Sequence, residues 1–164
     1  MKFDPSIVQA RYAGPLGDMI VAATARGVAG IWFEGQKHMP DNSSWPERPA
    51  HPVLARAIAQ LHEYFGGTRD AFDLPLDLQG GTAFQQSVWQ ALLAIPRGGT
   101  TSYGVLGQRI GRPAAMRAVG AAVGRNPLSV VVPCHRVLGA DGSLTGYAGG
   151  LQRKTALLQL EGVL

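Results

Sequence analysis

The sequence predicts an α+β protein in which a three-stranded antiparallel sheet with one helix precedes a mostly helical half. In the first third of the chain, short apolar or alternating runs are separated by turn residues. After residue 82, apolar residues recur at helical spacing. Between these two regions, Phe72–Gly81 is extended and then glycine-rich. We therefore expect an N-terminal domain at residues 1–78 and a C-terminal domain at residues 79–164.

Turn signals divide the first region into three strands and a helix. Residues 35–50 are rich in Pro, Ser and Asn and predict a loop, in which Trp45 is expected to be a packing lid. Apolar residues recur at helical spacing over Val53–Phe65, and Gly66 ends this helix, which is expected to cover the sheet. The strands are expected at Ile7–Tyr12, Met19–Thr24 and Val28–Phe33.

The second region begins with a capping box, in which Thr82 and Gln85 satisfy free donors at the start of a helix that Pro96 ends. Two short helices follow, the first capped by a hydroxyl residue and the second with Pro113 at its first turn. A glycine-containing turn joins them, which is the helix-turn-helix pattern. The helices of this half are expected at 82–95, 101–110, 114–123 and 151–161.

Cys134 is the only cysteine of the chain, and His135 and Arg136 follow it directly. A β-branched run from Val130 to Pro133 predicts a strand that ends just before the thiol, where chemistry often concentrates. An isolated cysteine is more often a small buried apolar residue. A neighbouring imidazole and guanidinium, however, favour the thiolate. We therefore interpret Cys134 as a nucleophile.

The last predicted helix points a carboxylate inward. Leu151, Leu157 and Leu158 share one arc of the helix, and Glu161 falls on the same arc. An inward carboxylate needs a partner, and His135 is the only histidine in this half. The alternative is that Glu161 lies in water at a frayed chain end. With the thiol, these residues would form a set of nucleophile, base and orienting carboxylate.

The positive charge of the chain lies in its second half. Residues 79–164 hold eight Lys and Arg against two Asp and Glu, whereas residues 1–78 hold seven against nine. This asymmetry favours a polyanionic partner. In the second helix of the helix-turn-helix, small residues surround Arg117, the one long polar side chain. Such a helix can approach a nucleic-acid groove closely but offers few groups for reading base edges.

Several other classes are disfavoured. No apolar run is long enough to span a membrane, and the chain does not start like a signal peptide. With a single cysteine, this indicates a reducing, cytoplasmic setting. The histidines of the first half are unclustered, so no metal site is expected. A redox role would need a second cysteine, and a cysteine hydrolase would not need a basic helical half.

Five segments of the second half resemble the O6-alkylguanine-DNA alkyltransferases, also called methylated-DNA-protein-cysteine methyltransferases. The segments are Arg117–Gly120, Asn126–Pro127, Pro133–Val137, Gly146–Tyr147 and Leu160–Gly162. The resemblance implies a ribonuclease-H-like N-terminal sheet and a winged-helix-like C-terminal domain. It also implies that the helix-turn-helix enters the minor groove of double-stranded DNA and that the damaged nucleotide is flipped into the protein.

The resemblance also implies roles for individual residues. Cys134 would accept the alkyl group, His135 would deprotonate it through a water, and Glu161 and Asn126 would orient and brace them. Arg117 would fill the gap that the flipped base leaves. The implied guanine-binding residues are Tyr103, Val137, Tyr147 and Ala148. The implied DNA-contacting residues are Ala115, Met116, Arg117, Ala118, Arg125 and Arg136.

The activity implied is an irreversible, single-turnover transfer from O6-alkylguanine to Cys134, with no cofactor and no metal. We expect a monomer; activity on O4-alkylthymine and cooperative loading along DNA stay open. Gly99 and Met116 depart from the family pattern, at positions where Glu and a smaller residue are usual. The alternative function is a DNA-binding protein that senses alkyl lesions without repairing them.

Overall fold

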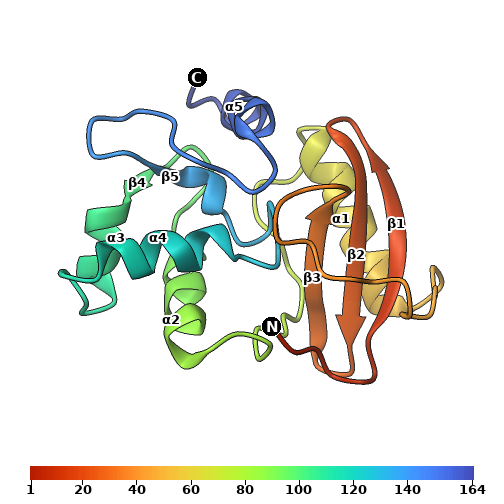
Figure 1. The fold of residues 1–164 in the computed structure, drawn as a ribbon. Helices are drawn as coiled ribbons and strands as arrows, with labels where there is room; N and C mark the ends of the chain where they lie inside the picture. Colours follow the sequence, from red (N-terminus) through yellow and green to blue (C-terminus); the bar gives the residue numbers. More distant parts are fainter.

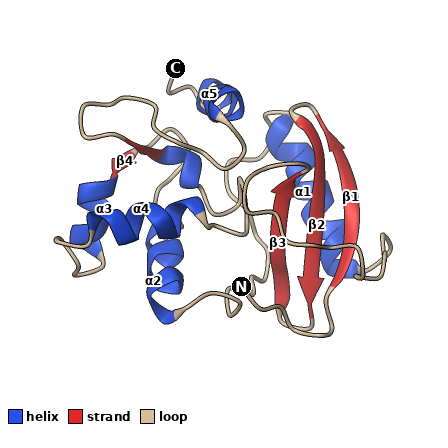
Figure 2. Ribbon diagram, in the orientation of Figure 1, coloured by secondary structure: helices blue, strands red, loops and turns tan.

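A computed structural model describes all 164 residues. Figure 1 shows the N-terminal sheet and helix α1 at one side of the molecule and helices α2 to α4 at the other. Figure 2 shows that all long strands belong to the first part and that the second part is mostly helix and loop. None of the helices combines the length and the apolar character that a membrane crossing needs.

The first sheet has the order β1-β2-β3 and is antiparallel throughout. Every residue of β3 is buried, because α1 covers one face of the sheet and an aromatic cluster covers the other. In that cluster Trp45 lies on Trp32 and Phe3, with ring centroids 5.7 and 5.4 Å away, so its expected packing role is confirmed. The elements are β1 (Val8–Gly14), β2 (Gly17–Thr24), β3 (Gly27–Phe33) and α1 (Pro52–Phe65).

The helical half contains the expected elements with small shifts. The capping box at the start of α2 is present, since Thr82 Oγ1 accepts from the Gln85 amide and Gln85 Oε1 accepts from the Thr82 amide. Helix α4 begins at Met116 instead of Ala114, with no side-chain cap. The elements are α2 (Ala83–Leu92), β4 (Thr101–Ser102), α3 (Tyr103–Arg109), α4 (Met116–Gly124), η1 (Cys134–Arg136), β5 (Val137–Leu138) and α5 (Leu151–Leu160).

The predicted strand before Cys134 is wrong. Residues 130–132 form a turn and a bend, and Cys134 starts a short 3-10 helix. The Asn126 amide donates to the Val132 carbonyl oxygen at 2.7 Å, and its oxygen accepts from the Leu128 amide at 3.0 Å. These bonds fold the segment back on itself, and Val130 has a positive φ of 74°. Tertiary contacts here override the strand preference of β-branched residues.

One hydrophobic cluster of 28 buried residues includes members of both halves, among them Phe33, Leu61, Trp89 and Leu157. The segment Phe72–Gly81, called the linker below, is hydrogen-bonded to strand β3. The Val28 amide donates to the Pro75 carbonyl, and the Asp77 amide donates to the Val28 carbonyl, both at 2.8 Å. The division into domains at residue 78 stays a prediction. The shared cluster and these bonds give the second half a fixed support.

A substitution at Gly27 tests how closely the linker packs against β3. Gly27 has a φ of 146°, and an added Cβ would overlap the Pro75 carbonyl. We expect Gly27→Ala to lower the free energy of unfolding by about 3 kcal/mol, combining strain at positive φ with overpacking. Gly67, at φ 79°, has open space around it, so Gly67→Ala should cost only about 1 kcal/mol. Urea unfolding measures both values; equal losses would contradict the close packing.

Candidate active site around Cys134

Cys134 is buried at the first position of η1 and lines a pocket of about 190 Å³. Helices α3 and α4 form one side of this pocket, and the glycine-rich loop before α5 forms another. The loop after β3 forms a third side, which the sequence did not predict. The pocket is lined by Lys37, His38, Tyr103, Gly120, Val123, Gly124, Cys134, Gly146, Tyr147 and Ala148.

The loop after β3 reaches the pocket through a long-range contact. The Lys37 amide donates to the Ala148 carbonyl oxygen at 3.1 Å, and His38 has a positive φ of 61°. Nothing in the composition of residues 35–50 indicates this, because the contact depends on how the two halves pack. Opposite the loop, the Tyr103 and Thr145 hydroxyls lie 2.9 Å apart and join α3 to the glycine-rich loop.

The thiol is not activated as the sequence suggested. Burial raises the pKa of Cys134 to about 11, while Asn126 and the charge of Lys154 lower it by less. The expectation that His135 and Arg136 favour the thiolate is wrong for this state, because both side chains bind Glu161 instead. Cys134 is therefore a neutral thiol at physiological pH.

The Glu161 carboxylate lies at the centre of a buried hydrogen-bond network. Its Oε2 atom lies 2.8 Å from His135 Nε2, as predicted, and its oxygens accept from Arg136 Nε and Nη2, both at 2.8 Å. Tyr64 Oη also donates to Oε2, at 2.6 Å. Burial alone would raise the pKa of Glu161, but these hydrogen bonds hold the pKa well below its ordinary value. Glu161 is therefore a carboxylate.

His135 is a neutral base in this setting. Burial lowers its pKa, and the hydrogen bond and charge of Glu161 oppose that effect only in part. Because a carboxylate only accepts, Nε2 carries the proton in the bond to Glu161. Nδ1 then has a free lone pair, and this buried atom makes no hydrogen bond within the protein. The arrangement is suited to taking up a proton at Nδ1.

Two further polar residues shape the loops around Cys134. Asn126 forms the predicted Asx turn and binds the Val132 carbonyl. The ammonium group of Lys154, on α5, is buried and donates to the Val137 and Thr145 carbonyls at 2.7 and 3.2 Å. Lys154 was not predicted as a site residue, although its position on the apolar arc of the last helix was a signal.

The helix-turn-helix presents most of its predicted contact residues to solvent. Met116, Arg117 and Ala118 are exposed on α4, Ala115 is half-buried before it, and Arg125 is exposed after it. The remaining predicted contact, Arg136, does not lie at this surface. It is buried, bound to Glu161 and to the Ile95 carbonyl. Its environment supports a structural role at the carboxylate.

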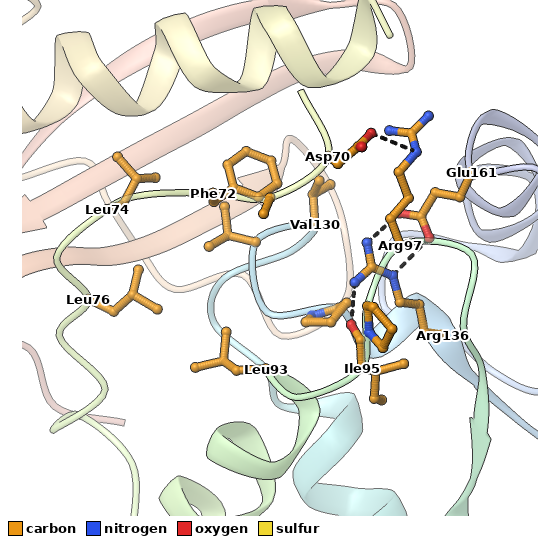
Figure 3. A pocket seen from close by; sticks show the side chains of 14 residues that line it. Asp70, Phe72, Leu74, Leu76, Leu93, Ile95, Arg97, Val130, Arg136 and Glu161 are labelled. Carbon is orange, nitrogen blue, oxygen red and sulfur yellow. Dashed lines mark hydrogen bonds and ion pairs between the residues drawn. The ribbon is translucent and has the colours of Figure 1, made fainter. Parts of the chain in front are cut away.

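A second cavity, of about 620 Å³, is larger but lacks the thiol. Figure 3 shows its lining: apolar side chains of the linker face the loop at Val130, and Arg136 and Glu161 close one end. Arg97 at the same end pairs with Asp70 at 3.6 Å.

No cluster of three His, Cys, Asp or Glu side chains that could hold a metal ion occurs in the chain. The pocket at Cys134 is therefore the candidate active site.

Two protein-family models match the chain. The 6-O-methylguanine DNA methyltransferase ribonuclease-like domain matches residues 7–78, and the DNA binding domain of the same name matches residues 83–163. A methylated-DNA–protein-cysteine methyltransferase of Mycobacterium tuberculosis is 47% identical over 147 residues, 90% of this chain and 87% of the relative.

Solved structures of the same family are also similar to this chain. The crystal structure of Mycobacterium tuberculosis O6-methylguanine methyltransferase has a TM-score of 0.86 and 44% identity, covering 94% of this chain and 92% of that one. The structure of Mycobacterium tuberculosis OGT in complex with DNA has a TM-score of 0.85 at the same identity, covering 94% and 91%. These matches confirm the predicted fold class, including the ribonuclease-like first half.

The resting state of the thiol can be titrated directly. We expect the difference in thiolate ultraviolet absorbance between the wild type and Cys134→Ser to have its midpoint near pH 11. Since an unfolded thiol ionises at about pH 8.5, the wild type should also lose stability between these values, a loss that Cys134→Ser avoids. A midpoint at or below the value for a free thiol would contradict a buried, neutral Cys134.

Proposed function

We infer the function of this chain from its family: it belongs to the methylated-DNA–protein-cysteine methyltransferases. We propose that it repairs DNA by transferring the alkyl group of O6-alkylguanine to Cys134. The observation that carries this proposal is the buried thiol beside a histidine whose Nε2 is bound to a carboxylate. The family suggests the reaction, and this geometry supports the residues to which we assign it.

The proposed reaction is a displacement at carbon. The Cys134 sulfur attacks the alkyl carbon, the bond from that carbon to O6 breaks, and its electron pair stays on the guanine oxygen. The thiol loses one proton and the restored guanine gains one, so the step is balanced. The product is a thioether on the protein, and its stability limits each molecule to one turnover.

The thiol needs a base because its pKa lies far above physiological pH. We assign this role to Nδ1 of His135, which would take the proton through a water molecule. The imidazolium formed would lie against the Glu161 carboxylate, 2.8 Å from Nε2, which stabilises the new positive charge. Asn126 would hold the Cys134 loop in place during the transfer, through its bond to Val132.

The burial of Cys134 implies that the damaged nucleotide leaves the DNA stack to react. The pocket supplies Tyr103, Tyr147 and the backbone of Ala148 around the base. Lys154 orients the Val137 carbonyl, which we assign to the guanine edge. The short Tyr103 to Thr145 contact would have to open or shift when a base enters.

We propose that α4 enters the minor groove. The small side chains of Ala115 and Ala118 allow close approach, Met116 lies against the groove, and Arg117 fills the space of the extruded base. Arg125 adds a phosphate contact, which positions the protein without reading sequence. A monomer suffices for this chemistry, and the single reduced thiol fits a cytoplasmic protein.

Intact-protein mass spectrometry tests the transfer. After mixing with a duplex that contains one O6-methylguanine, we expect each protein molecule to gain the mass of one methylene. Peptide mapping should place this gain on Cys134, and Cys134→Ser should gain nothing. An unmodified wild type that still binds the damaged duplex would instead support the lesion-sensing alternative.

A substitution at Arg117 tests the extrusion role. Arg117→Ala should slow transfer from duplex DNA by roughly tenfold or more, since a few kcal/mol of unstacking are then uncompensated. Affinity for undamaged DNA should fall much less, because only one phosphate-attracting charge is lost. Arg112→Ala removes an exposed arginine just before α4 and serves as the control. Equal losses of transfer and affinity in Arg117→Ala would contradict the assignment.

A further inference from the structure

A tyrosine of the N-terminal half donates to the carboxylate of the candidate active site. Tyr64 Oη lies 2.6 Å from Glu161 Oε2, and the two residues are 97 positions apart in the sequence. Tyr64 belongs to α1, which packs on all three strands of the first sheet, whereas Glu161 follows α5. Through this bond, the first half of the chain supplies a group to the network that holds His135.

Tyr64 and His135 share one oxygen atom. Glu161 Oε2 accepts hydrogen bonds from the Tyr64 hydroxyl, His135 Nε2 and Arg136 Nη2. Oε1 accepts only from Arg136 Nε. Donors on the same oxygen compete for its negative charge. The Tyr64 hydroxyl therefore weakens the attraction between the carboxylate and His135, while it fixes the carboxylate in place.

Packing alone does not explain why residue 64 carries a hydroxyl group. Its ring is fully buried against Phe65 and Phe72, with the Arg97 guanidinium 5.5 Å from the ring centre. A phenylalanine would fill the same space. Burial, followed by the charge of Glu161, raises the pKa of Tyr64, so the hydroxyl remains a donor at any physiological pH. What the hydroxyl adds is its bond to Glu161.

We propose that Tyr64 is a positioning residue for alkyl transfer, which orients Glu161 and limits how strongly Glu161 binds the proton-accepting His135. This inference rests on the proposed function, because it assigns His135 the role of base. The charged groups around His135 come from two elements: α5 provides Lys154 and its C-cap residue Glu161, and η1 provides Arg136. Tyr64 is the contribution of α1, and Arg97 lies beside its ring.

The substitution Tyr64→Phe removes the hydroxyl and keeps the ring. Oε2 then has two donors, and its bond to His135 becomes stronger. The pKa of His135 should rise, by about half a unit for one lost hydrogen bond to a shared carboxylate. Because neutral imidazole is the base, the acid limb of the plot of transfer rate against pH should move to higher pH by the same amount.

Tyr12→Phe provides a matched control. Tyr12 is also buried in the first half, stacks on Phe65, and makes no side-chain hydrogen bond within the protein. Its substitution should leave the pH profile unchanged. In a Glu161→Gln background, Tyr64→Phe should cause no further shift, because the shared charge is gone. A shift that persists there would overturn the proposal.

A direct titration separates this inference from the proposed function. The pKa of His135, followed by nuclear magnetic resonance of labelled imidazole, does not depend on alkyl transfer. Equal values in the wild type and Tyr64→Phe overturn the role of Tyr64 even if transfer occurs. A higher value in Tyr64→Phe supports the positioning of the imidazole, and a wild type that transfers no alkyl group would refute the proposed function alone.

A second variant covers the case in which Tyr64→Phe does not fold. Tyr64→3-fluorotyrosine keeps the ring and the hydroxyl and makes the hydroxyl a stronger donor. The pKa of His135 and the acid limb should then both move to lower pH, opposite to the effect of phenylalanine. A shift upward, or no shift, would overturn the proposal.

Discussion

The buried carboxylate of Glu161 is the interaction on which the rest of the site depends. Its side chain has no exposure, and a buried charge is tolerated only when it is paired and hydrogen-bonded. Four hydrogen bonds from His135, Arg136 and Tyr64 meet this need. Removing the charged partner of such a carboxylate, here Arg136, typically costs about 3–5 kcal/mol. The same bonds that stabilise the interior therefore fix the orientation of the imidazole.

The thiol of Cys134, our proposed nucleophile, is held uncharged by its surroundings. Burial outweighs the effects of Asn126 and Lys154 and maintains a protonated thiol. In the single-turnover reaction that we propose, a neutral thiol would protect Cys134 against modification by other electrophiles, which attack thiolates. The neighbouring base is neutral as well, so neither charge exists until a proton moves between them. In our account, activation accompanies the arrival of the extruded base.

Local patterns predicted much of this molecule. Turn residues predicted the three strands, and the capping box predicted the start of α2. The apolar arc of the last helix predicted that Glu161 points inward and contacts His135. Long-range contacts were missed. The run at residues 130–133 has the composition of a strand, but the Asn126 amide folds it into turns. Tyr64 lies one helical turn after Leu61 on the buried face of α1, yet no sequence pattern says that its hydroxyl meets a residue of the other half.

Both halves contribute to the candidate site: the first provides Tyr64 and the loop that lines the pocket, and the second provides the thiol, the proposed base and the helix that we propose faces DNA. The central claim is that Glu161 holds His135 as a neutral base with its free nitrogen at Nδ1. Nitrogen-15 nuclear magnetic resonance of the His135 ring at neutral pH tests it most directly. We predict a neutral ring protonated at Nε2; a protonated imidazolium, or a neutral ring protonated at Nδ1, would contradict the account.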